Sequence, residues 1–204
     1  MVKEIQKGAC NVFRKRKDPI ISIFADLPVL HTERLTLRAM RASDDADMYE
    51  YACDPRVTEY LLWDVHPDRF YTARYLDYVI KHYRTGEFTD WAVTVTETGK
   101  MIGTCGFTRI DREHGTGEVG YVLNPAFWGK GIAAEAVRAV LAFGFERLEL
   151  HRIEAKFMRG NERSLRVMEK CGMKFEGYRR EAMRIKGRYS DIGYAAVLRR
   201  EFKK

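Results

Sequence analysis

A turn built around Gly129 and Gly131 is the feature of this sequence best suited to chemistry. A strand-like run, Gly120–Leu123, leads into the turn, and an alanine-rich amphipathic segment follows it. Glycines allow sharp bends, and the first turn of a helix leaves N–H groups unpaired at the positive end of its dipole. The pattern predicts either an anion-binding loop or an ordinary turn before a helix. A dinucleotide fingerprint is excluded because it needs a glycine where Ala134 stands, and no Walker lysine followed by Ser or Thr occurs.

The cysteines do not form a metal-binding pattern. Cys10, Cys53, Cys105 and Cys171 are widely spaced, without a Cys-x-x-Cys pair or a histidine at ligand spacing. We therefore expect no metal site and no disulfide framework. Cys105 lies in a strand pattern and Cys171 in a helical pattern, which favours buried free thiols.

The composition is typical of a globular protein. With 204 residues, 46% of them hydrophobic, and no long apolar run, the chain is expected to form one globular domain without a membrane span. The first ten residues lack the apolar core of a signal peptide, so we expect a cytoplasmic protein. The formal net charge of +7 indicates attraction to an acidic partner, whether a polyphosphate cofactor, nucleic acid or a ribosomal surface. The basic run Arg14–Lys17 is either a solvated face or a nucleic-acid contact.

The spacing of apolar residues predicts strands and helices that alternate along the chain. Residues 1–28 are interpreted as an N-terminal extension, with a further strand at Ile20–Phe24, and residues 29–204 as a single domain. Strands are predicted at 35–40, 91–96, 101–110, 117–123, 151–157, 174–185 and 189–200. Helices are predicted at 44–53, 67–84, 132–148 and 161–171, the first of them capped by Ser43-Asp44-Asp45.

The order of these elements favours a mixed sheet of the α/β class with helices on both faces. Two strands on either side of a single helix imply a parallel pair, whereas short turns such as residues 97–100 imply antiparallel hairpins. Within the helix at 67–84, helical spacing places one set of side chains on the face expected to be buried: Phe70, Ala73, Leu76, Val79, Ile80 and Tyr83.

Four sequence blocks, in this order, resemble the Gcn5-related N-acetyltransferases (GNAT), and more narrowly their ribosomal-protein N-terminal acetyltransferase branch of the Rim type. The blocks are L-H-T-E-R-L-T-L-R at 30–38, D-P-R-V-T-E-Y-L at 54–61, G-E-V-G-Y-V-L-N-P-A-F-W-G-K-G-I-A at 117–133 and N-E-R-S-L-R-V-M-E-K-C-G-M-K-F-E-G at 161–177. The resemblance implies a mostly antiparallel sheet with one splayed parallel pair of strands. It also implies acetyl-CoA as the co-substrate and an amine as the acceptor.

The resemblance assigns a cofactor role to the glycine turn. In the family the loop reads Gln or Arg, two residues, Gly, one residue, then Gly or Ala, and here Trp128 stands at the polar position. The residues implied to surround the pyrophosphate of acetyl-CoA are Gly129, Lys130, Gly131, Ile132, Ala133 and Ala134. The exposed backbone implied to pair with the pantetheine arm belongs to Tyr121, Val122 and Leu123. Asn161 matches an asparagine that contacts the cofactor arm in the family, and it is also a candidate helix N-cap.

Amine acetylation by a thioester needs a proton acceptor for the amine and a proton donor for the leaving thiolate. Glu118 matches the position of the base in many members of the family, although a surface residue or a salt-bridge partner is the alternative. The tyrosine that many relatives place seven residues after the motif asparagine is replaced by Met168. Ser164 is the substitute hydroxyl that we expect, with a capping role in the first helical turn as the alternative.

The acceptor is not identified by the sequence. Trp63, Tyr71, Tyr75 and Trp91 either line an acceptor groove or pack in the core, and the lone His66 has no partner at ligand spacing. The leading hypothesis is acetylation of the N-terminal amine of a ribosomal or other protein. A polyamine or aminoglycoside acetyltransferase, and a non-catalytic acyl-CoA-binding or ribosome-associated module, are the alternatives. A homodimer is left open.

Overall fold

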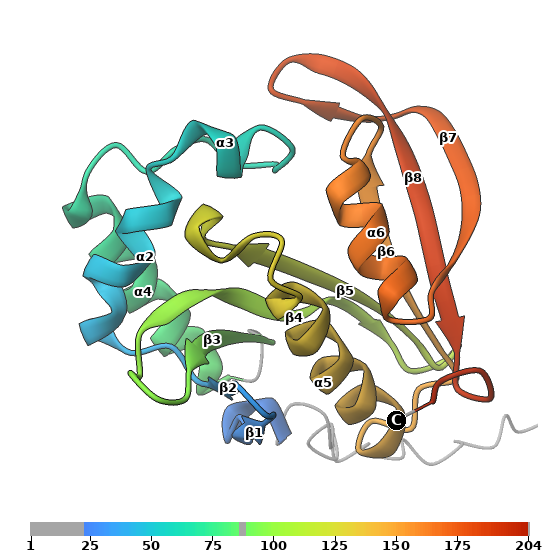
Figure 1. Cartoon of the computed structure of the whole chain (residues 1–204), viewed down its shortest axis with the longest axis horizontal. Helices are drawn as coiled ribbons and strands as arrows, with labels where there is room; N and C mark the ends of the chain where they lie inside the picture. Colours follow the sequence, from blue (N-terminus) through green and yellow to red (C-terminus); the bar gives the residue numbers. More distant parts are fainter. Residues whose placement is uncertain (1–22, 86–88, 204) are drawn as a thin grey trace, which may run out of the picture.

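One mixed sheet of eight strands organises the protein, and it confirms the α/β class expected from the sequence (Figure 1). The computed structural model describes residues 23–85 and 89–203. The strand order is β1-β2-β3-β4-β5-β6-β8-β7. The strands are β1 Leu30–His31, β2 Leu35–Arg38, β3 Asp90–Val95, β4 Met101–Asp111, β5 Thr116–Leu123, β6 Arg152–Met158, β7 Lys174–Ile185 and β8 Arg188–Leu198.

The helices begin where polar side chains can pair with free backbone N–H groups. They are α2 Asp45–Ala52, α3 Pro55–Thr58, α4 Arg69–Tyr83, α5 Ile132–Glu146 and α6 Glu162–Lys170, with 3-10 turns η1 Ala42–Asp44 and η2 Pro125–Phe127. Asp68 accepts from the Tyr71 N–H at 2.7 Å and begins α4. Asn161 accepts from the Ser164 N–H at 3.2 Å and begins α6. In the part of the chain that the structure describes, no helix is both long and apolar enough to cross a membrane.

Helices cover both faces of the sheet. Side chains along β3 point alternately to the two faces, so each face contributes to a different hydrophobic core. Trp91 and Val93 belong to the core shared with α5 and α6, whereas Ala92 belongs to the core shared with α2 and α4. The predicted hairpin of β3 and β4 is confirmed, with Trp91 opposite Cys105. Cys105 and Cys171 are buried free thiols, as expected.

The parallel pair of strands is β5 and β6, and the two strands stay together over only three residues. Thr116, Gly117 and Glu118 pair with residues 152–154, and no pairing with β6 follows along the rest of β5. Beyond this point β6 pairs with β8, while β5 continues beside β4 up to Leu123. The strands therefore diverge, as Figure 1 shows, and the edge of β5 that faces β6 is left unpaired after Glu118.

The structure corrects three local expectations. In α4 the buried positions are Thr72, Leu76, Val79 and Tyr83, whereas Phe70 is 72% exposed, because it lies in the first turn and off this face. Residues 23–25 are helical, so the strand predicted at Ile20–Phe24 is wrong for its described part; residues 20–22 lie outside the described residues.

Asp44 does not cap helix α2 with its side chain. Instead its carboxylate binds the Arg38 guanidinium through two contacts, at 2.7 and 2.8 Å, and accepts from the Arg41 N–H. Only 4% of Asp44 is exposed, so this ion pair is largely withdrawn from water and ties the end of β2 to the start of α2.

The boundary placed between residues 28 and 29 stays a prediction. Of the described residues before it, Phe24 is fully buried and packs edge-on against Trp91 and Phe143. The indole N–H of Trp91 donates to the Pro28 carbonyl at 2.7 Å. The basic run Arg14–Lys17 and Cys10 lie outside the described residues.

Candidate active site

A cleft of about 1680 Å³ opens where β5 and β6 diverge, between α6 on one side and the α3–α4 region on the other. Eleven of the twelve predicted site residues line this one cleft: Glu118, Tyr121, Val122, Leu123, Gly129, Gly131, Ile132, Ala133, Ala134, Asn161 and Ser164. The exception is Lys130. Its ammonium lies 5.4 Å from the centre of the Phe127 ring, and its carbonyl accepts from Arg34 at 3.0 Å.

The loop that begins α5 presents six consecutive free N–H groups. Gly129 and Gly131 both have φ of +76°, a left-handed conformation that glycine adopts without strain. Within the described chain, no hydrogen bond uses the N–H groups of residues 129–134, and the first to be used is that of Glu135, which donates to the Gly131 carbonyl. Unpaired N–H groups at the positive end of a helix dipole are groups of the kind that bind phosphate in proteins.

Trp128 occupies the position where the GNAT motif has a polar side chain, and it fixes the loop to the end of β5. Its indole N–H donates to the Leu123 carbonyl at 2.7 Å, and the Arg163 guanidinium lies 5.1 Å from the ring centre. The Leu123 carbonyl is thereby occupied. Val122 pairs with Thr104 of β4, and the Asn124 N–H donates to the Ile102 carbonyl. The alternation along β5 therefore turns the Val122 carbonyl toward β4 and the Tyr121 carbonyl toward the unpaired edge.

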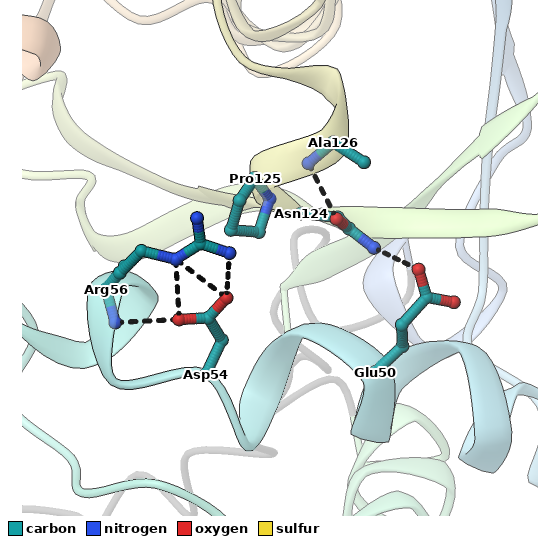
Figure 2. A pocket seen from close by; sticks show the side chains of 6 residues that line it. All are labelled: Glu50, Asp54, Arg56, Asn124, Pro125 and Ala126. Atoms are coloured by element: carbon teal, nitrogen blue, oxygen red, sulfur yellow. Dashed lines mark hydrogen bonds and ion pairs between the residues drawn. The ribbon is translucent and has the colours of Figure 1, made fainter.

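A second, smaller pocket of about 370 Å³ lies beside the start of the loop, and a hydrogen bond among its lining side chains joins the loop to α2 (Figure 2). The Asn124 amide donates to Glu50 at 3.0 Å, while its oxygen accepts from the Ala126 N–H at 2.9 Å. Asp54 and Arg56 form an ion pair of 2.6 Å. Because these polar groups satisfy one another, the pocket is best explained as the anchor of the loop.

Glu118 lies at the fork between the two strands, since it is the last residue of β5 that pairs with β6. It is 8% exposed and lines the cleft. The Thr108 hydroxyl donates to one of its carboxylate oxygens at 2.5 Å, and the Lys156 ammonium lies 3.0 Å from the other. Glu118 therefore forms the salt bridge that was the alternative interpretation, and it also occupies the position expected of a base.

Ser164 and Asn161 stand at the first turn of α6, on the far side of the fork. The Ser164 hydroxyl lies 2.7 Å from the Tyr121 hydroxyl, which also donates to the Ser164 carbonyl at 3.0 Å. Asn161 is the N-cap, as one alternative predicted. Burial raises the pKa of Tyr121, so the phenol is protonated at neutral pH and available as a donor.

The aromatic residues considered for the acceptor side separate into two groups. Trp91 is fully buried in the core, whereas Trp63, Tyr71 and Tyr75 line the cleft around His66. Sequence reasoning missed Asp90, Tyr51 and Lys156, which line the same cleft. The available signal was an aspartate at the first position of a strand whose next four residues are buried. Lys156 became visible only through the pairing of β6 beside Glu118.

The comparisons with known proteins agree with this geometry. Residues 34–174 match the family described as "Acetyltransferase (GNAT) domain". The chain is 36% identical over 176 residues to the uncharacterized N-acetyltransferase p20 of Bacillus licheniformis, which covers 86% of this chain and 99% of that protein. YnaD of Bacillus subtilis, also named an N-acetyltransferase, is 32% identical over 171 residues, 84% of this chain and 97% of its own.

A solved structure shares both the fold and the family. The crystal structure of a GNAT-family acetyltransferase from Bacillus anthracis matches with a TM-score of 0.77 and 31% identity, covering 85% of this chain and 100% of that one. The family match, the full-length relatives and the divergent β5–β6 pair lead to the same assignment. The chain belongs to the GNAT family of N-acetyltransferases, enzymes that use acetyl-CoA.

Proposed function

We propose that the enzyme transfers the acetyl group of acetyl-CoA to the N-terminal amine of a ribosomal or other protein. The observation that carries the cofactor part is the run of free N–H groups at residues 129–134, which continues through the first turn of helix α5. These donors suit the pyrophosphate of acetyl-CoA, and the unpaired edge of β5 suits the amide groups of its pantetheine arm. The thioester would then lie near the fork, between Glu118 and Ser164.

In this proposal Glu118 accepts a proton from the acceptor ammonium, directly or through water. The neutral amine attacks the thioester carbonyl, the new C–N bond forms, and the C–S bond breaks as the thiolate of CoA leaves. Ser164 supplies a proton to that thiolate and draws on the hydroxyl of Tyr121. The Lys156 ammonium, 3.0 Å from a carboxylate oxygen of Glu118, helps to hold this side chain at the fork.

Relatives with named acceptors support two acceptor classes. YdaF of Bacillus subtilis, whose name assigns it provisionally to ribosomal N-acetylation, is 34% identical over 104 residues, 51% of this chain and 57% of that protein. A spermidine N(1)-acetyltransferase of Vibrio cholerae is 28% identical over 102 residues, 50% of this chain and 59% of its own. A polyamine is therefore the second candidate acceptor. The relatives are named as N-acetyltransferases, which favours an enzyme over a non-catalytic acyl-CoA-binding module.

A ribosomal acceptor would place the enzyme in the cytoplasm and would suit its net charge of +7, since ribosomal RNA is acidic. A homodimer is compatible with this proposal but is not required by it, because one chain supplies the whole cleft.

The deciding experiment measures the release of CoA thiol with purified enzyme and a panel of acceptors. The panel contains peptides with free Ala or Ser N-termini, the same peptides with blocked N-termini, spermidine and spermine. Turnover of the free peptides alone is the expected result. Turnover of the polyamines alone would support a polyamine acceptor in place of a protein N-terminus. If the enzyme binds acetyl-CoA but releases no thiol with any acceptor, the proposed function is contradicted.

A further inference from the structure

The carboxyl group of Asp90 lies in the cleft beside two glycines of neighbouring strands, Gly106 and Gly120. Asp90 pairs with Gly106 of β4, and Gly106 pairs in turn with Gly120 of β5. A Cβ atom at Gly106 would clash with the carboxyl and backbone of Asp90, so the aspartate lies directly over that glycine. Neighbouring strands are about 4.8 Å apart, which puts this carboxyl roughly one strand spacing from Gly120, the residue before Tyr121.

No positive group offsets the Asp90 carboxyl in the described structure. Burial raises the pKa of Asp90 to about 7, with no hydrogen bond or cation to lower it. The Tyr83 hydroxyl donates to the main-chain carbonyl of Asp90 and not to its side chain. Asp90 still lines the cleft, so a cation that enters the cleft can reach it. An ionised carboxyl in such a place gains more from a bound cation than one already paired.

Tyr51 is a second side chain of the cleft with a polar group that has no hydrogen-bond partner among the described residues. Its hydroxyl is buried and has no hydrogen-bond partner among the described residues. Tyr51 lines the cleft and is 2% exposed. Burial first, and then the charges of neighbours that include Asp90, raise the pKa of Tyr51, which places the two side chains within electrostatic reach of each other. A buried hydroxyl without a partner costs free energy that a bound polar group would recover.

Aromatic rings line the same cleft, and one of them lies near Asp90, since burial first and then the charge of Asp90 raise the pKa of Tyr75. The His66 ring centre lies 5.4 Å from that of Trp63, 4.8 Å from that of Tyr71 and 5.8 Å from that of Tyr75. His66 Nδ1 is bonded to the Thr72 hydroxyl at 2.8 Å, and burial lowers the pKa of His66, so its ring is neutral near pH 7. Tyrosine and tryptophan faces attract ammonium groups, and a neutral histidine does not repel them.

We propose that Asp90, the Tyr51 hydroxyl and the rings around His66 form the binding site for the ammonium group of the acceptor. This inference rests on the proposed amine acetylation and adds the residues that select the acceptor. Asp90 is a binding residue here, and the role of base stays with Glu118. Acceptors with an unhindered primary ammonium group are favoured over neutral or anionic compounds of the same size.

Steady-state kinetics of Asp90→Asn tests the site, with Asp77→Asn on the exposed side of α4 as the matched control. A hydrogen bond to a charged group is worth about 1.5–3 kcal/mol, so the KM for the amine should rise about 10-fold or more in Asp90→Asn. The KM for acetyl-CoA should stay at the wild-type value in both variants. Asp90→Glu keeps the charge and should recover part of the lost affinity. An unchanged amine KM in Asp90→Asn overturns the inference.

A binding measurement keeps this test separate from the proposed function and from any folding defect. Calorimetry with wild-type enzyme and n-butylammonium, compared with n-butanol, needs no turnover. Binding of the ammonium compound at millimolar concentration, without binding of the alcohol, is expected even if every acceptor in the thiol-release assay fails. Equal behaviour of the two compounds, including binding of neither, overturns the inference.

Discussion

The Tyr121 hydroxyl lies 2.7 Å from the Ser164 hydroxyl and thereby joins β5 to the first turn of α6 across the fork of the sheet. The family's tyrosine position, seven residues after Asn161, holds Met168 here, which is buried. A phenol from β5 therefore reaches the end of α6 where the helix itself supplies none. The phenol has a single proton, which either the Ser164 carbonyl or the Ser164 hydroxyl can accept, and the serine hydroxyl is free to donate into the cleft when its own oxygen accepts that proton.

Removal of either hydroxyl should slow turnover. Ser164→Ala is expected to lower kcat by about 100-fold, the smaller end of the range for general acid catalysis. Tyr121→Phe should lower kcat by about 5-fold, as expected for one neutral hydrogen bond. The double variant should be no slower than Ser164→Ala, because the tyrosine acts through the serine. Tyr189→Phe, at an exposed tyrosine of β8, is the control, and wild-type kcat in Ser164→Ala would contradict the role.

Replacement of the proposed base should affect turnover and not cofactor binding. Glu118→Gln keeps the size of the side chain and the contact with Thr108, and kcat is expected to fall by about 100-fold or more. The Kd of acetyl-CoA, measured by calorimetry, should not change. Glu154→Gln is the matched control, because Glu154 pairs with Glu118 in register but lies outside the cleft. If Glu118→Gln turns over as fast as the wild type, another group accepts the proton.

Gly131 should be sensitive to substitution for a backbone reason. Its φ of +76° costs about 1–2 kcal/mol for a residue with a Cβ atom, although the space around it is open apart from Arg34 at 3.6 Å. Gly131→Ala is therefore expected to weaken acetyl-CoA binding as the loop N–H groups reorient. Gly172→Ala, with φ of +84° and open space at the end of α6, should lose similar stability with an unchanged Kd. Equal Kd values in both variants would argue against the loop as the cofactor site.

The raised pKa of Asp90 predicts how stability depends on pH. The unfolded chain releases this proton near 3.8 and the folded enzyme near 7, so the folded state holds more protons between these values. The free energy of unfolding must then fall as pH rises through this window, by up to about 1.4 kcal/mol per pH unit, and level off above it.

Urea denaturation of wild type and Asp90→Asn at several pH values isolates this contribution, because the other titrating groups cancel in the difference. The stability of the wild type relative to the variant should decline from pH 3.8 to about 7. A difference that does not change with pH would show that the carboxyl titrates normally in the folded enzyme.

Local patterns predicted most of the elements because each depends on residues close in sequence. The alternation in β3 and β4, the asparagine that caps α6 and the glycines before α5 are all readable in this way. Helix α4 shows the limit, because Phe70 fits helical spacing but not the face that the sheet covers. Which apolar side chains of a helix are buried depends on the neighbour on which the helix packs.

The sequence by itself determined the family resemblance, the mixed sheet and eleven residues of one cleft, since short motifs and periodicity record local backbone geometry. Only the tertiary structure showed that Tyr121 meets Ser164, that Lys156 meets Glu118 and that Asp90 faces the cleft over Gly106. These pairs join residues that are 16 to 43 positions apart in the sequence. Their contacts are set by strand register and by the divergence of β5 from β6, which no local pattern contains.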